Sequence, residues 1–182
     1  MIALILIDQQ KGIDHPKLGE RNNLDAENEM LKLLHIWREN DWPIFHVQHK
    51  SKEKDSVFWP EQEGVEFKDE FKPMNSEPVI EKSIPCAFLK SSLAEKLTNL
   101  NINSVAVIGV ATNNSIEATA RTGGNLGFNV YIVEEACFTF AKKDYFGAPR
   151  TASEVHAMSL ANLHGEYATV LNSDQLLSKA KI

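Results

Sequence analysis

The chain has 182 residues, of which 43% are hydrophobic, and its 25 acidic residues exceed the 19 basic ones, giving a formal net charge of −6. This length suits one well-buried core and is short for two, so we expect a single domain over residues 1–182. The acidic balance argues against nucleic acid or an anionic membrane as a partner and favours a small molecule.

The first predicted element is a buried strand over residues 2–8, IALILID. Its apolar run has no basic leader, is closed by Asp8, and is too short for a signal sequence or a membrane span. The chain holds only two cysteines, Cys86 and Cys137, without a CxxC or Cys/His cluster, which suggests neither a disulfide framework nor structural zinc. Together these features predict a cytoplasmic protein.

The rest of the chain alternates between helical and strand patterns. After the first strand the sequence predicts a helix over 22–40, a strand over 42–49, an ordered aromatic loop over 50–78, a short strand over 78–81, a helix over 88–100 and a strand over 104–109. It then predicts a helix over 112–126 with Thr112, Asn113 and Asn114 as possible caps, a strand over 128–136, a helix over 151–164, a strand over 167–171 and a helix over 173–179 capped by Ser173.

This alternation of predicted strands and helices is typical of βαβ units around a parallel sheet. We therefore expect an α/β fold, a Rossmann-like three-layer α/β/α sandwich with a six-stranded, mostly parallel sheet, whose strand order one sequence does not reveal. In such folds ligands bind at the carboxyl edge of the strands.

Two polar residues lie where strands of this sheet are predicted to end. Asp8 closes an apolar strand, and a carboxylate in that position suits general acid–base chemistry, although an aspartate there can equally cap a turn. Ser115 lies in the first turn of a helix that follows a buried strand and Gly109, where backbone amides favour an anion, although a serine in a first turn is commonly a plain helix residue. Position alone leaves both alternatives open.

Three segments together resemble the isochorismatase-like, or cysteine hydrolase, family: DQQ after the first strand, EKSIPCAF, and GVATNNSIEATA. The resemblance extends over nearly the whole chain. It implies that Asp8 and Lys82 are catalytic and that position 115 corresponds to the family's cysteine nucleophile. It also implies a cis peptide between Val110 and Ala111, with the amides of Ala111 and Ser115 lining an oxyanion hole.

The departure is the serine at position 115, because an alcohol ionises several pH units above a thiol, whose pKa is about 8.5. A serine nucleophile would need Asp8 to take its proton directly. Alternatively, the reaction proceeds without a covalent step, as the resemblance to the family's true isochorismatases implies. We therefore expect a hydrolase of a small amide, ester or vinyl ether, with a catalytically impaired protein that binds a small ligand or acts through oligomeric interaction as the alternative.

The resemblance and the local sequence suggest further roles. His49, Phe58 and Trp59 are expected at the pocket rim, with Gln10 and Asn114 as polar lining. We expect no cofactor and no metal, because the segment after the second strand lacks the Asp and His arrangement of the family's nicotinamidases. Cys86 is expected in the pocket wall, Cys137 in the core and His156 in a structural role, and family resemblance implies a homo-oligomer, a dimer or larger, for which the aromatic loop is a candidate interface.

Overall fold

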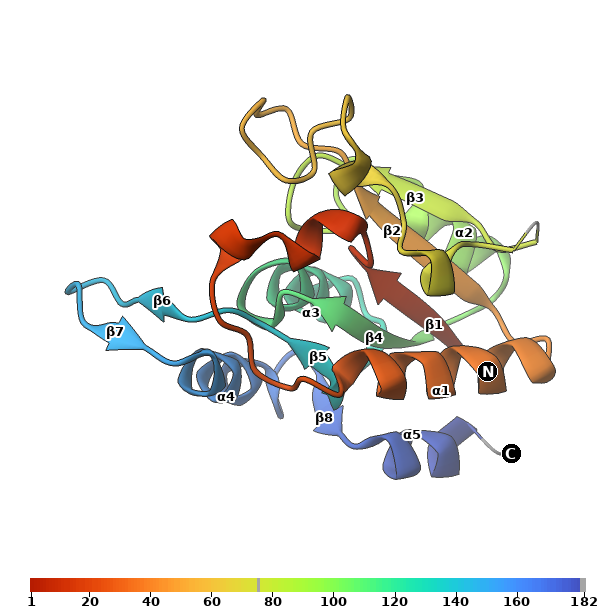
Figure 1. Cartoon of the computed structure of the whole chain (residues 1–182). Helices are drawn as coiled ribbons and strands as arrows, with labels where there is room; N and C mark the ends of the chain where they lie inside the picture. The colour runs from red at the N-terminus through yellow and green to blue at the C-terminus, as the bar shows by residue number, and fades with distance from the viewer. Residues whose placement is uncertain (75, 181–182) are drawn as a thin grey trace.

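The computed structural model describes residues 1–74 and 76–180. Strands and helices alternate along the chain (Figure 1). The strands are β1 (Ile2–Ile7), β2 (Ile44–His49), β3 (Val79–Lys82), β4 (Ser104–Val110), β5 (Asn129–Phe138), β6 (Lys142–Lys143), β7 (Pro149–Arg150) and β8 (Thr169–Leu171). The α-helices are α1 (Ala26–Glu39), α2 (Leu93–Asn99), α3 (Glu117–Asn125), α4 (Ala152–Leu163) and α5 (Ser173–Ala180).

The central sheet has six strands in the order β3-β2-β1-β4-β5-β8. Each neighbouring pair is parallel, and the register places Ile7 beside Val47 on one side and Gly109 on the other. The predicted α/β fold is thereby confirmed. Because all six strands point the same way, the residues after β1, β2, β3 and β4 lie at one edge of the sheet.

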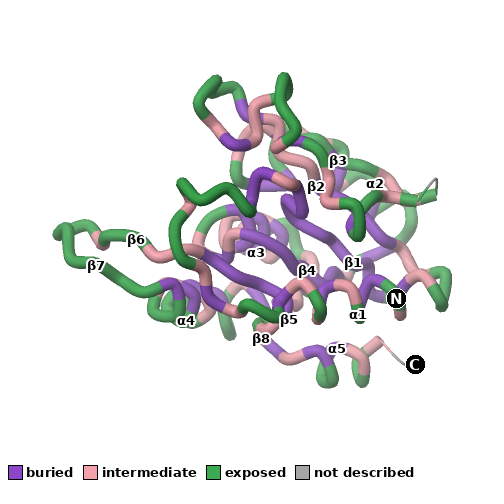
Figure 2. The backbone as a smooth tube through the Cα atoms, in the orientation of Figure 1, coloured by how far each residue is buried: buried purple, intermediate pink, exposed green. Residues whose placement is uncertain are grey.

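Two apolar layers hold the helices onto the sheet. The side chains of Leu4 and Leu6 face α1 and α5, whereas Ile5 and Ile7 face α2, α3 and α4. This alternation follows from the period of two in a strand. Figure 2 shows the result, with the central strands buried throughout and the outer turns of the helices exposed.

Two helices begin later than the sequence predicts. The backbone of Asn23 is left-handed, with φ 44°, and α1 starts only at Ala26. Likewise Lys90 has φ 55°, and the Ser91 hydroxyl donates to the carbonyl of Ala87, so residues 88–92 form a turn before α2. Helical spacing of apolar residues continues across both turns, which is why periodicity alone extends the helices too far.

The predicted helix caps are also corrected. Asn172, not Ser173, caps α5, since its Oδ1 accepts the amide of Gln175. Thr112, Asn113 and Asn114 do not cap α3; they lie in one turn of π-helix, Thr112–Ile116, that lacks a side-chain cap. The hairpin of β6 and β7 was not predicted, because its strands have two residues each and carry no alternating pattern.

None of the helices in the described part of the chain is both long enough and apolar enough to cross a bilayer.

Candidate active site

Asp8 is the first residue after β1 and lies at the carboxyl edge of the sheet. Its backbone is left-handed, with φ 55°, while its amide still donates to the carbonyl of Val47, 3.0 Å away. The residue is 3% exposed. The chain therefore turns sharply at Asp8 and leaves a carboxylate buried where the strands end.

Lys82 is the last residue of β3, in register with His49 at the end of β2. Its ammonium lies 2.8 Å from Asp8 Oδ2, 3.2 Å from Ser115 Oγ and 3.2 Å from His49 Nδ1. The Lys82 side chain is fully buried. A buried ammonium is stabilised only if its charge and its protons find partners, and here both do.

Ser115 is carried by the turn that follows β4. Gly109, with φ 126°, lies against β1, and a Cβ on it would be 2.2 Å from the carbonyl oxygen of Ile7. The peptide bond between Val110 and Ala111 is cis. Ser115 follows in the π-helical turn, and its hydroxyl donates to Asp8 Oδ2 over 2.8 Å. The sheet edge thus brings together Asp8, Lys82 and Ser115, which are far apart in sequence.

Two polar groups beside this cluster lack a partner among the described residues. Asp8 Oδ1 is buried and accepts no hydrogen bond, although Oδ2 of the same carboxylate accepts two. The amide of Ala111 likewise has no acceptor in the described part of the chain. An unsatisfied buried oxygen costs about 1–3 kcal/mol, so a ligand that donates to Oδ1 gains this energy on binding.

His49 extends the cluster towards the aromatic loop. Its ring lies 5.6 Å from that of Phe58, between centroids, at a tilt of 58°. Burial, and then the positive charge of Lys82, lower the pKa of His49 below its ordinary value, against a smaller opposite effect of Asp8. His49 is therefore a neutral ring at neutral pH.

Known proteins share this chain's sequence and fold. Residues 2–175 match the model of the isochorismatase domain. The chain belongs to the isochorismatase family. It is 39% identical to the isochorismatase family protein YrdC of Bacillus subtilis, over 97% of this chain and 94% of that protein. A crystal structure of an isochorismatase-family protein from Chromobacterium violaceum is 45% identical, covering 97% of this chain and 92% of that one, with a TM-score of 0.94.

A more distant relative has a named enzymatic activity. Nicotinamidase 3 of Arabidopsis thaliana is 27% identical over 96% of this chain and 86% of that protein. The family is thus one of hydrolase-like proteins, and this isochorismatase domain has the family's α/β fold.

The remaining predicted site residues, Gln10, Asn114 and Trp59, differ in how far they are buried. Gln10 is fully buried: its amide nitrogen donates to the carbonyls of His49 and Val65, and its oxygen accepts the amide of His49. This places Gln10 behind His49, where it holds backbone in position rather than lining a pocket. Asn114 is exposed on the outer side of the π-helical turn, and Trp59 is half-buried in the aromatic loop.

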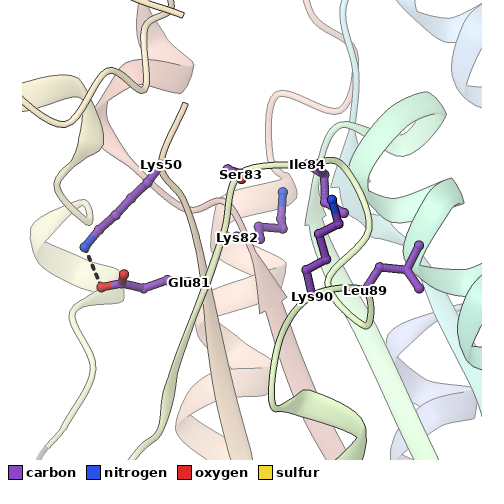
Figure 3. A pocket seen from close by; sticks show the side chains of 7 residues that line it. All are labelled: Lys50, Glu81, Lys82, Ser83, Ile84, Leu89 and Lys90. Atoms are coloured by element: carbon purple, nitrogen blue, oxygen red, sulfur yellow. Dashed lines mark hydrogen bonds and ion pairs between the residues drawn. The ribbon is translucent and has the colours of Figure 1, made fainter. Parts of the chain in front are cut away.

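A pocket of about 210 Å³ opens beside the end of β3 (Figure 3). Its lining includes Lys82 but neither Asp8 nor Ser115; the other lining residues are Lys50, Glu81, Ser83, Ile84, Leu89 and Lys90. Lys50 and Glu81, which both belong to this lining, form an ion pair with each other. Sequence reasoning drew on the segment EKSIPCAF for Lys82 and placed Cys86 in the pocket wall, but it missed Ser83, Ile84, Leu89 and Lys90 as lining residues, although their position shortly after Lys82 was a usable signal.

Three other singled-out residues, Cys86, Cys137 and His156, are buried and make no described hydrogen bond to Asp8, Lys82 or Ser115. Cys137 is fully buried, and burial raises the pKa of its thiol to about 12, which confirms its assignment to the core. Cys86 is packed in the apolar layer under α2 and α3. His156 is buried with Nδ1 2.8 Å from the hydroxyl of Thr112, as expected of a structural residue. Within residues 1–74 and 76–180, no three His, Cys, Asp or Glu side chains gather as metal ligands.

Proposed function

We propose that this isochorismatase-family protein hydrolyses a small amide, ester or vinyl ether, with Asp8 as general acid or base. The observation that carries the proposal is the state of the Asp8 carboxylate. One oxygen is held by Lys82 and Ser115, and the other is buried with no described partner. A carboxylate fixed through one oxygen presents the other to a proton on substrate or water.

The neighbouring groups support distinct roles in such a reaction. For an amide or ester, Asp8 takes a proton from the attacking water and returns it to the leaving atom, while the substrate oxygen receives hydrogen bonds from the amides of Ala111 and Ser115. For a vinyl ether, protonated Asp8 gives its proton to the vinyl carbon, water adds to the resulting oxocarbenium and returns a proton to Asp8, and the hemiketal divides into alcohol and carbonyl compound. Lys82 holds Asp8 in place in both cases.

Ser115 supports two versions of the proposal. Its hydroxyl donates to Asp8 Oδ2, so a covalent route in which Asp8 takes the serine proton is geometrically open. An alcohol is the weaker nucleophile at neutral pH, because its pKa lies several units above that of a thiol, about 8.5. We therefore favour the route without a covalent intermediate, in which Ser115 binds and orients.

The second candidate function is small-ligand binding without turnover. Its supporting observation is the same serine, which the family resemblance places at the position of a cysteine nucleophile. The name of the nicotinamidase relative supports the hydrolase instead, because that protein is an amidase by name.

The test is a panel of small primary amides, small esters and isochorismate, assayed with wild type, Asp8→Asn, Ser115→Ala and Ser115→Cys. General acid–base catalysis contributes about 10²–10⁴-fold, so Asp8→Asn is expected to lower kcat at least about 100-fold. Ser115→Ala is expected to retain turnover within about tenfold. Lys32→Met, at an exposed ion pair on α1, is the matched control for surface charge.

The covalent route, the binding protein and a failure of the role given to Asp8 each predict a different experimental result. An acyl-serine adduct found by mass spectrometry in wild type, together with an inactive Ser115→Ala, would establish the covalent route. Binding of panel members by wild type without turnover would establish the binding protein. Turnover that survives Asp8→Asn would refute the role given to Asp8.

A further inference from the structure

His49 connects the buried cluster of Asp8, Lys82 and Ser115 to solvent. The three cluster residues are 3%, 4% and 5% exposed, whereas His49 is half-buried. The Nδ1 atom of His49 lies 3.2 Å from the Lys82 ammonium. The Nε2 atom has no partner in the described part of the chain and is not one of its buried unpaired atoms, so it is open to solvent. A proton from solvent can therefore reach His49, and its charge then acts on the cluster.

The position of His49 is fixed at both its backbone and its ring. Gln10, which is fully buried, accepts the His49 amide over 2.8 Å and donates to the His49 carbonyl over 2.9 Å. The ring packs against that of Phe58, with centroids 5.6 Å apart. Because His49 and Lys82 are register neighbours on β2 and β3, their side chains leave the sheet on the same face. These contacts keep Nδ1 facing the ammonium.

The acceptor at Nδ1 determines where Lys82 directs its protons. The ammonium has three N–H donors, of which two go to Asp8 Oδ2 over 2.8 Å and to Ser115 Oγ over 3.2 Å. His49 Nδ1 accepts the third. An unpartnered N–H on a buried ammonium is costly, so loss of this acceptor favours a shift of Lys82 away from its present position. Since Lys82 holds Asp8 Oδ2, His49 acts on the carboxylate through Lys82.

Protonation of His49 reverses this contact. A protonated ring carries a hydrogen on both nitrogens, so Nδ1 no longer accepts and a second cation faces Lys82 at 3.2 Å. The two like charges repel, and the added positive charge also makes Asp8 a weaker base. The charged groups that act on His49 are Lys82 and Asp8, whereas Gln10 and Phe58, from the other segments packed against it, are uncharged.

We propose that His49 is a positioning residue for the Lys82 ammonium and that Asp8 requires neutral His49 for its acid–base role. The inference rests on the proposed function of Asp8, and it gives His49 a role beyond the pocket rim, because the ring holds Lys82. Burial and Lys82 keep the pKa of His49 below its ordinary value. The neutral, working form is therefore present at neutral pH and is lost as the pH falls through that lowered pKa.

Two substitutions separate the acceptor from the ring. His49→Asn keeps an acceptor near the place of Nδ1 but removes the ring and its titration, whereas His49→Phe keeps a ring against Phe58 and removes the acceptor. On a substrate that wild type turns over, we expect His49→Asn to keep kcat/KM within about tenfold at pH 7.5. His49→Phe should lower kcat about 10- to 100-fold with KM nearly unchanged, the effect of one lost hydrogen bond to a charged group. His35→Asn, at an exposed histidine on α1, is the matched control and should change neither constant.

The pH dependence of the same variants tests the effect of protonation. For wild type, kcat/KM should fall as the pH decreases through the pKa of His49, measured by NMR on the same protein. In His49→Asn the decline at that pH should be absent. A His49→Phe variant as active as wild type, or a pH profile of His49→Asn identical to that of wild type, would overturn the proposal.

A measurement without substrate separates this inference from the proposed hydrolase activity. In protein labelled with nitrogen-15 lysine, the Lys82 ammonium signal is followed between pH 8 and 4 in wild type and His49→Asn, and Lys82→Met assigns the signal. We expect the wild-type signal to shift with the same midpoint as the His49 ring, and His49→Asn to lack that step.

The two kinds of failure then give different results. A Lys82 signal that does not respond to the titration of His49 would refute the positioning role, even in a protein that turns over members of the panel. A signal coupled to His49 in a protein that turns over none of the panel would support the hold of His49 on Lys82 and refute the proposed hydrolase.

Discussion

Lys82 uses each of its three ammonium protons inside the protein, which determines the proton position on a neighbouring ring. The three acceptors are Asp8 Oδ2, Ser115 Oγ and His49 Nδ1. Because an ammonium can only donate, His49 Nδ1 must accept. The ring proton of neutral His49 is therefore expected on Nε2, which bonds to no described residue.

Nitrogen-15 chemical shifts of the His49 ring at pH 7.5 measure this directly. We expect the Nε2–H tautomer in wild type and a mixture of tautomers in Lys82→Met, where the donor to Nδ1 is gone. A proton on Nδ1 in the wild-type protein would contradict the hydrogen-bond network described for Lys82.

Variants of the buried ion pair between Asp8 and Lys82 test whether these two charges raise the free energy of unfolding. Removing one partner of a buried pair strands the other charge and costs about 3–5 kcal/mol. We expect this loss in the free energy of unfolding for Asp8→Asn and for Lys82→Met. The double variant Asp8→Asn/Lys82→Met should be more stable than either single variant, because no charge is then left buried alone.

Urea denaturation of wild type, the two single variants and the double variant completes a double-mutant cycle. Lys32→Met, at an exposed pair with Glu29, serves as the control and should change the unfolding free energy by less than about 1 kcal/mol. A double variant less stable than both single variants would mean that the two side chains stabilise the fold independently, and would contradict the expectation that each single variant strands a buried charge.

At the scale of elements, the close approach of β4 to β1 places Asp8 beside the turn of Ser115. Gly109 has φ 126°, and an added Cβ would meet the Ile7 carbonyl oxygen at 2.2 Å, which is backbone that cannot rotate away. Gly109→Ala is therefore expected to lower the unfolding free energy by at least about 3 kcal/mol, from backbone strain and displacement of β1.

The matched control is Gly127→Ala. Gly127 also has a positive φ, 90°, but a Cβ added to it would have no atom within 4 Å, so only the cost of the backbone conformation, about 1–2 kcal/mol, should appear. Equal losses at the two glycines, measured by thermal and urea unfolding, would show that the contact with Ile7 is unimportant.

The same elements explain which parts of the fold and of the candidate site could be predicted from the sequence alone. Continuous apolar runs such as Ile2–Ile7 predict buried parallel strands, because both faces of the sheet are covered by helices. The convergence of Asp8 with Lys82 was expected from the family resemblance, since the strand order that creates it is not encoded locally. The β6 and β7 hairpin was missed because its form depends on the side chain of Asp144.

At the scale of the whole molecule, stability depends on three histidines that folding removes from water. Burial lowers the pKa of His46, His49 and His156 below their ordinary values, against partial compensation by acceptors such as Glu77 for His46. In the unfolded chain a histidine has a pKa of about 6.5. Below that pH the unfolded state binds protons that the folded state does not, so stability falls as the pH falls.

We therefore expect the free energy of unfolding to be highest above about pH 7 and to decrease as the pH is lowered through 6.5, until the folded histidines also take up protons.

A second loss of stability, from Glu77, follows at lower pH. Burial raises the pKa of Glu77, but hydrogen bonds from Arg38, the Met74 amide and His46 together have the larger effect and lower that pKa to about 2. Its contribution is present above the ordinary glutamate pKa of 4.5 and is lost as the pH falls from there towards 2.

Urea unfolding at intervals between pH 8 and about pH 2 separates these contributions. His156→Gln should flatten the slope around pH 6.5 and leave the loss below pH 4.5 unchanged, because Glu77 contacts His46 and not His156. His35→Gln, on the exposed side of α1, is the matched control and should keep the wild-type slope. If stability instead rose as the pH fell from 7 to 6, the folded histidines would have to bind protons more tightly than the unfolded ones, and their burial beside Lys82 and Thr112 could not be as described.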